Sequence, residues 1–200
     1  LSMVSHELRS PLTSLKGSLN ILQHLEIEKN GEASSLLDMA VRNTDQLAVI
    51  VNDILDVTTM QAGKLKMIFE KVNLASLIKN AVNQNLSRLS KCEVSVHIPD
   101  EAKIQNVYGD ELKLVQVISN LLSNAEKFSR KENAKINVTV GQENNLAKIS
   151  ISDNGIGIAD EFKDQIFTTF HQVGSDPNQK LPGTGLGLSI CKHIIKSHNG

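Results

Sequence analysis

Tryptophan is absent from this 200-residue chain, and aromatic residues make up only 3% of it, as five Phe and one Tyr. Because hydrophobic residues still reach 40%, any core must be mostly aliphatic. The longest unbroken apolar run, Leu47–Val51, is far too short to cross a bilayer, and no signal peptide opens the chain. A net charge of −1 without a block of basic residues gives no electrostatic basis for binding nucleic acid. We therefore expect no nucleic-acid partner and no membrane contact within this segment.

Cysteine is scarce as well. Cys92 and Cys191 have neither a CxxC spacing nor histidines at the spacing of metal ligands. We interpret them as buried or half-buried thiols in a reducing compartment. The expected location of this segment is therefore cytoplasmic, which leaves open whether the parent protein is membrane-anchored.

The first 63 residues predict a helical hairpin. Leucines recur at steps of four and three residues, the period of a coiled-coil seam, at Leu8, Leu12, Leu15, Leu19 and Leu22. The pattern breaks at residues 28–32, which contain an Asn-Gly pair, and resumes at Leu37, Val41, Thr44, Leu47, Val51, Ile54 and Thr58. A lone hairpin would leave half of its apolar stripe in water. We therefore expect two hairpins to pair into a dimeric four-helix bundle, which makes the protein a homodimer.

Gly63 is a typical helix stop and divides a helical domain, residues 1–63, from a second domain, residues 64–200. Apolar patterns in the second domain predict strands at 65–69, 94–98, 107–109, 135–140 and 147–152, with 107–109 continuing the sheet of 94–98. Helical periodicity predicts helices at 74–89, 111–128, 160–166 and 186–197. The predicted fold class is an α helical hairpin followed by an α+β sandwich.

Four motifs carry the candidate chemistry. A histidine lies in Ser5–Pro11, two asparagines lie in Asn120–Phe128, an Asp-Asn-Gly turn opens Asp153–Ile158, and three glycines lie in Gly183–Leu188. Each motif alone is weak evidence, because short motifs recur by chance. Together, in this order, they resemble the catalytic core of a sensor histidine kinase over nearly the whole chain. The second domain resembles the Bergerat ATP fold, which gyrase-type ATPases share, and neither a Walker loop nor a protein-kinase glycine loop is present.

The resemblance implies an ATP-dependent protein-histidine kinase that uses ATP and magnesium. A surface imidazole can attack the terminal phosphate of ATP if a base keeps one ring nitrogen unprotonated. By resemblance, His6 is the acceptor and Glu7 is the general base or orienting group. The phosphoryl group would then pass to an aspartate on the receiver domain of a response regulator.

Ser10 lies one turn after His6 on the same helix face. In related kinases this position helps to position a water that dephosphorylates the regulator, so the resemblance implies weak phosphatase activity. The alternative is that Ser10 only satisfies a backbone carbonyl beside the bend at Pro11.

The remaining motifs predict a nucleotide site. Asn120 and Asn124 share a helix face, and amide oxygens can ligate magnesium without adding charge. A carboxylate at the end of a strand can accept a hydrogen bond from the exocyclic amine of adenine. The glycine motif opens a helix, whose free amides favour phosphate. By resemblance, Asn124 ligates magnesium, and the nucleotide is bound by Asn120, Lys127, Phe128, Asp153, Gly155, Gly157, Lys180, Gly183, Thr184, Gly185, Leu186 and Gly187.

Residues 173–182 are expected to form a lid, anchored in the core by Phe167 and Phe170. Many relatives carry Tyr-Arg where this chain has His171-Gln172. Lys180 is therefore only a substitute candidate for the cation that would contact the terminal phosphate.

Two other functions remain open. One is a catalytically silent module for dimerisation and docking, although such a module usually loses one of the four motifs. The other is an ATPase that drives a conformational clamp, although such machines lack the histidine-bearing hairpin. The family usually carries two further strands after the last helix. We therefore expect the chain to be a fragment that lacks the C-terminal strands of its second domain.

Overall fold

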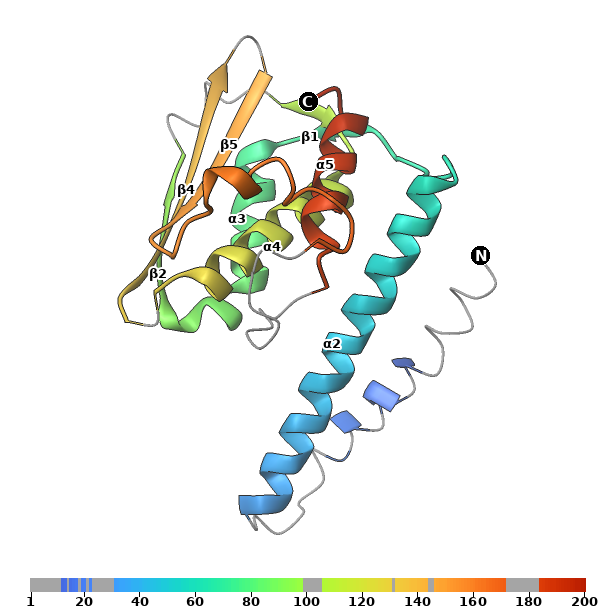
Figure 1. The fold of residues 1–200 in the computed structure, drawn as a ribbon, viewed down its shortest axis with the longest axis vertical. Coiled ribbons are helices and arrows are strands. Elements are labelled where there is room, and N and C mark those ends of the chain that lie inside the picture. Colours follow the sequence, from blue (N-terminus) through green and yellow to red (C-terminus); the bar gives the residue numbers. More distant parts are fainter. Residues whose placement is uncertain are drawn as a thin grey trace. The chain divides into compact units, whose positions relative to one another are not determined.

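The computed structural model describes residues 12–13, 15–17, 19–20, 22, 31–98, 106–130, 132–143, 146–171 and 184–200 (Figure 1). It divides the chain into two compact units, Leu1–Leu65 and Lys66–Gly200. Each unit is described by itself. Five of the predicted site residues lie outside the described residues: His6, Glu7, Ser10, Lys180 and Gly183.

The first unit contains a long helix, α2, at Gly31–Gln61, and the described residues between 12 and 22 are also helical. Leu36, Leu47 and Ile54 are exposed apolar side chains of α2. They lie eleven and seven residues apart and therefore share one face of the helix. The predicted stop at Gly63 is confirmed by its left-handed backbone, with φ of 64°. Gly63 N–H donates to the Met60 carbonyl and Lys64 N–H to the Thr59 carbonyl, which is the Schellman pattern of helix termination.

The second unit is an α+β sandwich, which confirms the predicted fold class. Its elements are β1 (Glu70–Val72), α3 (Leu74–Asn85), η1 (Arg88–Lys91), β2 (Cys92–His97), β3 (Val107–Gly109), α4 (Glu111–Phe128), β4 (Ala134–Glu143), β5 (Leu146–Asp153), η3 (Asp160–Phe162) and α5 (Gly187–Ser197). The larger sheet has the order β2-β4-β5, with β2 parallel and β5 antiparallel to β4. A separate two-stranded sheet pairs β1 with β3.

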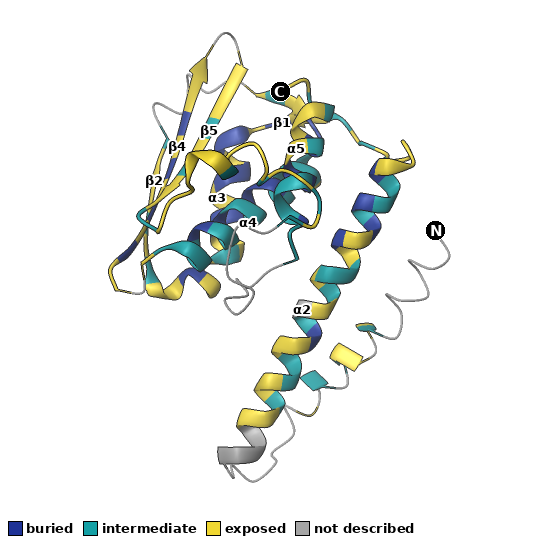
Figure 2. Cartoon of the chain, in the orientation of Figure 1, coloured by how far each residue is buried: buried dark blue, intermediate teal, exposed yellow. Residues whose placement is uncertain are grey.

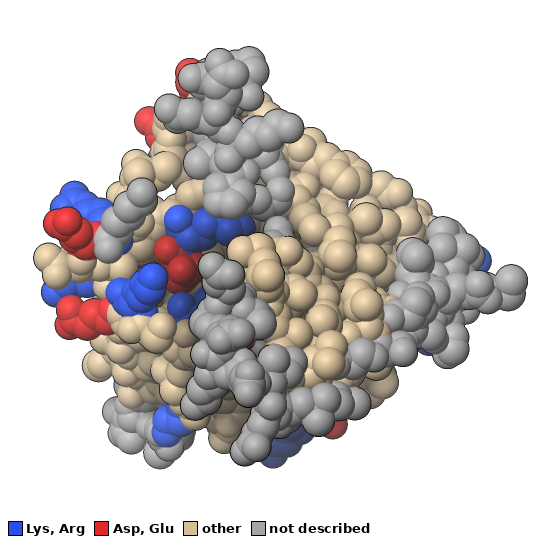
Figure 3. Space-filling view, turned by 90° about the horizontal axis from the view of Figure 1, so that it is seen from below, with Lys and Arg blue, Asp and Glu red and all other residues tan. Residues whose placement is uncertain are grey.

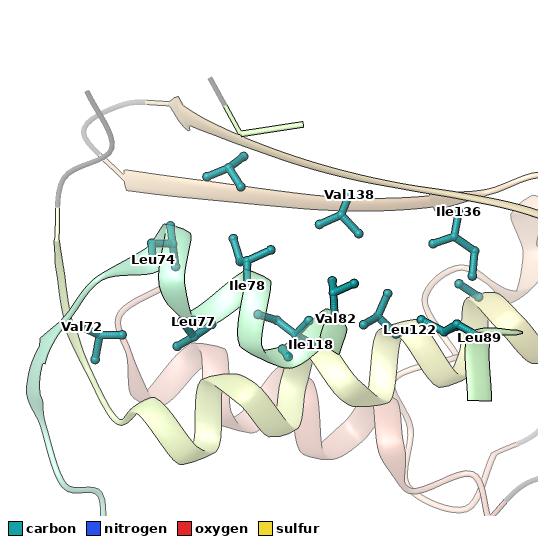
Figure 4. Close-up of a cluster of buried hydrophobic side chains, with 13 residues drawn as sticks. Val72, Leu74, Leu77, Ile78, Val82, Leu89, Ile118, Leu122, Ile136 and Val138 are labelled. Atoms are coloured by element: carbon teal, nitrogen blue, oxygen red, sulfur yellow. The ribbon is translucent and has the colours of Figure 1, made fainter. Parts of the chain in front are cut away.

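The core lies between the larger sheet and helices α3 and α4, as the buried segments in Figure 2 show. Strand β4 alternates strictly, with Ala134, Ile136, Val138 and Val140 buried and the residues between them exposed. Figure 4 shows Val138 pointing from the sheet toward Val82 of α3, and Ile136 pointing toward Leu122 of α4 and Leu89 of η1. The side chains in this cluster are aliphatic, as the composition predicts.

Four predicted elements were wrong in extent or place. The strand expected at 65–69 lies instead at Glu70–Val72, and β3 pairs with it rather than continuing the larger sheet. The helix expected at 74–89 ends at Asn85, because the chain turns into η1, which buries Leu89. The helix expected at 160–166 is only the short 3₁₀ turn η3. In contrast, the helix at 111–128 is confirmed over its full length, as are the strands at 135–140 and 147–152.

Buried Asp110 joins three segments that are distant in sequence. Its Oδ1 caps α4 by accepting from Lys113 N–H at 3.0 Å, and its Oδ2 accepts from Ile68 N–H at 2.9 Å. Its own N–H donates to His198 Nε2 at 2.9 Å, just after the end of α5. A Cβ on Gly109 would lie 2.8 Å from the His198 ring, so only glycine fits there. Asp110 therefore fixes where α4 begins relative to the rest of the unit.

We expect Asp110→Ala to lower the free energy of unfolding by about 2–3 kcal/mol, since it removes a helix cap and leaves a second backbone donor without its acceptor. Urea titration of the full chain measures this change. The control is Asp160→Ala, which removes an exposed ion pair with Lys163 and should leave the midpoint nearly unchanged. Equal midpoints for the two variants would contradict the role of Asp110.

Candidate nucleotide site

Helix α4 presents the predicted polar residues on one face. Its buried positions Ile118, Leu122 and Ala125 pack into the core. Asn120, Asn124 and Lys127 are spaced by four and three residues, so they share another face of the helix. Asn124 and Lys127 are half-buried. The packing of the apolar face therefore sets the direction in which these three side chains project.

Asn120 carries a polar group that the protein leaves unsatisfied. Its amide nitrogen Nδ2 is buried without a hydrogen-bond partner. Gly187, at the start of α5, lies close to it, since a Cβ on Gly187 would be 3.7 Å from that nitrogen. A buried unsatisfied donor costs about 1–3 kcal/mol, so it points to an external acceptor at this place. The free backbone amides at the start of α5 favour the same chemistry, an anion such as phosphate.

Lys127 supplies positive charge beside an aromatic ring. Its ammonium Nζ lies 5.9 Å from the centroid of the Phe128 ring. Burial lowers the pKa of the Lys127 ammonium below its ordinary value, the charge of Arg88 lowers it further, and Glu126 raises it. A bound polyphosphate would offset both of the unfavourable effects. Elsewhere on the face drawn in Figure 3, basic and acidic side chains of the described residues lie intermixed.

The Asp153 motif closes against the end of α4. Asp153 is the last residue of β5, and its Oδ1 accepts from Gly155 N–H at 2.8 Å. Ile156 N–H donates to the Phe128 carbonyl at 3.3 Å. A Cβ on Gly155 would collide with that carbonyl and lie 2.6 Å from Asp153 Oδ1, so glycine is required. The contact brings the Asp153 carboxylate and Phe128 together, as the sequence predicts for an adenine site.

The glycine motif is held by backbone contacts of Phe170 rather than by the burial of phenylalanine side chains. Phe170 N–H donates to the Gly185 carbonyl at 3.0 Å, and a Cβ on Gly185 would lie 2.8 Å from Phe170 C. Leu186 is buried, and its N–H donates to Thr184 Oγ1 at 3.3 Å. The expectation that Phe167 and Phe170 anchor the lid in the core was wrong, since Phe170 is 68% exposed and Phe167 is 38% exposed.

The described residues place Asn120 beside the start of α5 and the Phe128 carbonyl against the Asp153 loop. Gly157 adopts the left-handed conformation, with φ of 72°. Sequence reasoning missed Asn154 and the buried hydroxyl of Ser129, which has no hydrogen-bond partner. The Asp-Asn-Gly turn pattern was the available signal for Asn154. Among the described residues, no three His, Cys, Asp or Glu side chains gather as metal ligands, and no helix is long and apolar enough to cross a membrane.

Residues 1–63 match the family described as "His Kinase A (phospho-acceptor) domain", and residues 109–200 match "Histidine kinase-, DNA gyrase B-, and HSP90-like ATPase". Sensor protein kinase WalK of Staphylococcus haemolyticus is 33% identical over 98% of this chain. The chain belongs to the sensor histidine kinase family. This kinase core spans about a third of the length of WalK.

Solved structures share the fold of the kinase core. ShkA, crystallised in complex with AMPPNP, matches 98% of this chain and 40% of its own, with a TM-score of 0.76 and 24% identity. The histidine kinase ThkA, in complex with the response regulator protein TrrA, matches 100% of this chain and 54% of its own, with a TM-score of 0.62 and 24% identity.

We expect Asp153→Asn to weaken ATP binding by about 1.5–3 kcal/mol, the usual loss for a hydrogen bond to a charged group. Asn retains an acceptor for Gly155 N–H, but its amide can turn a donor toward the adenine amine. Calorimetry with ATP measures the change, and Asp160→Asn, at an exposed position of η3, is the matched control. Unchanged ATP affinity in Asp153→Asn would place adenine elsewhere.

Proposed function

We propose that this chain is the core of an ATP-dependent protein-histidine kinase of two-component signalling. The helical domain, residues 1–63, carries the phosphate acceptor, and the catalytic domain, residues 64–200, binds ATP with magnesium. The observation that carries the proposal is the unsatisfied amide of Asn120 facing the start of α5, together with the Asp153 loop closed on Phe128. These features build a phosphate end and an adenine end on one helix.

Each residue has a definite task in this proposal. The Asp153 carboxylate accepts from the adenine amine, and the Phe128 ring covers the base. The Asn124 amide oxygen would hold magnesium, which would offset the charge of the phosphates. Asn120, Lys127 and the amides of Gly185 and Gly187 bind the phosphates, and Leu186, whose N–H donates to Thr184 Oγ1, holds the turn between them. The motif assigns Gly183, Thr184 and Lys180 to the same end of the nucleotide.

The transfer step assigns roles to the two residues at the acceptor. A lone pair on the His6 ring forms a bond to the terminal phosphorus, and the bond from that phosphorus to the bridging oxygen breaks, so ADP leaves. Glu7 accepts or orients the proton of the other ring nitrogen. Both residues are assigned on the motif and on the match to the phospho-acceptor family.

Partners follow from the same reasoning. The exposed face of α2 with Leu36, Leu47 and Ile54 supports a homodimer through the helical hairpin. The fold shared with ThkA, solved with a response regulator, supports a receiver domain as the next phosphate acceptor. We place the segment in the cytoplasm, where such regulators are phosphorylated.

Incubation with ATP labelled at the terminal phosphate tests the activity. We expect the protein to retain label at neutral pH and to lose it in acid, because phosphohistidine is acid-labile. His6→Gln should take up no label. ATP affinity of that variant should stay near normal, because His6 is not among the residues that bind ATP in this proposal. His97→Gln, at an exposed position of β2, is the control and should label normally. Release of free phosphate without retained label would indicate an ATPase, and label persisting on His6→Gln would exclude His6.

Ser10 gives a separate prediction for phosphatase activity. Its hydroxyl can hold a water for hydrolysis of the regulator's phosphoaspartate, but it lacks the methyl group that restricts the rotamers of threonine. We expect Ser10→Ala to abolish dephosphorylation of the regulator and Ser10→Thr to raise it, with His6 labelling unchanged in both. If neither change alters dephosphorylation, then Ser10 has only a structural role.

A further inference from the structure

The side chain of Asn154 ties the loop after β5 to the start of β4. Its Oδ1 accepts from Lys135 N–H at 3.0 Å, and its Nδ2 donates to the Asn133 carbonyl at 2.8 Å. Its own N–H donates to the Lys135 carbonyl at 3.3 Å. The Asn133 backbone is left-handed, with φ of 56°, so its carbonyl and the Lys135 N–H face the same side chain. One amide thus satisfies a donor and an acceptor of the neighbouring strand.

This requirement selects asparagine. The side chain must present one acceptor and one donor at fixed separation, which an amide does and a carboxylate does not. Aspartate would place a second acceptor oxygen against the Asn133 carbonyl. Alanine would leave both backbone groups without their partner.

The neighbours of Asn154 are the residues of the adenine site. Asp153 precedes it, and Gly155 and Ile156 follow it against the Phe128 carbonyl. The Asp153 side chain is exposed, and its carboxylate accepts from Gly155 N–H within the same loop. The direction of its carboxylate therefore depends on two attachments of the loop. Asn154 bonds to the start of β4, and Gly155 lies against the Phe128 carbonyl at the end of α4.

We propose that Asn154 is a positioning residue that aims the Asp153 carboxylate and so sets the preference for adenine over guanine. This inference rests on the proposed function, in which Asp153 binds the adenine amine. Asn154 touches neither the base nor the phosphates in this role. Its substitution should therefore change nucleotide affinity and base selectivity but leave phosphoryl transfer at saturating ATP close to normal.

Two variants of the full chain test the inference. Asn154→Ala removes both side-chain bonds without a charge, and Asn154→Asp keeps the size but replaces the donor with an acceptor. Asn137→Asp is the control for added charge, because Asn137 lies on the exposed face of β4 and accepts from Ser95 through an oxygen that Asp retains. Calorimetry gives the affinities for ATP and GTP, and hydrogen exchange of the Gly155 and Ile156 amides in the nucleotide-free protein reports loop order.

We expect both Asn154 variants to bind ATP about tenfold more weakly, with GTP affinity changed much less, and to show faster exchange at Gly155 and Ile156. The maximal labelling rate of His6 should stay within about twofold of the unchanged protein. Asn137→Asp should match the unchanged protein in the affinity ratio and in exchange.

Two outcomes separate the inference from the proposed function. If the unchanged protein binds ATP and both Asn154 variants keep its ratio of ATP to GTP affinity, Asn154 is only structural and the positioning role is overturned, whatever happens to the melting temperature. If the unchanged protein binds no ATP at all, the proposed function itself fails, and the positioning role with it.

Discussion

The burial of Ile118, Leu122 and Ala125 fixes the rotation of α4 about its own axis. These side chains fill the space between α4 and its neighbours in the core, so the helix cannot turn without exposing apolar surface. This fixed rotation also determines where the polar side chains of α4 point. Asn120, Asn124 and Lys127 project where they do because the apolar face has no alternative orientation. The packing of aliphatic side chains on one face of α4 therefore sets the direction of the polar side chains on another face.

Both ends of α4 are fixed as well, by different means. Asp110 caps its first turn and binds Ile68 and His198, while the Phe128 carbonyl at its last turn accepts from Ile156 and lies against Gly155. In the proposed site the phosphates lie at the start of α5, and His198 follows the last residue of the same helix. Helix α5 thus connects the glycine motif to residues 68–69, where Phe69 packs on the His198 ring at 5.0 Å. A shift of α5 would therefore move both the glycine motif and the contact of His198 with Phe69.

The elements with long, regular patterns could be predicted from the sequence. The period of α4 and the alternation of β4 and β5 follow directly from the side chains that one face must bury. The place of β1 and the partner of β3 could not be predicted, because three-residue strands carry almost no pattern and their pairing depends on segments more than thirty residues apart. The motifs name the residues of the proposed nucleotide site, but the bonds of Asn154 go to backbone groups of residues 133–135. A sequence does not show which backbone groups a fold brings within reach.

The hydrogen bond from Phe170 to the Gly185 carbonyl closes the chain on both sides of residues 172–183. The entropy of bringing these two residues together is offset by the contacts of Phe170 and His171 with Gly185. By the general scaling of loop closure, doubling the length of chain between two such fixed points costs only about 0.6 kcal/mol. The position of Gly185 therefore depends far more on this contact than on the number of residues that separate it from Phe170.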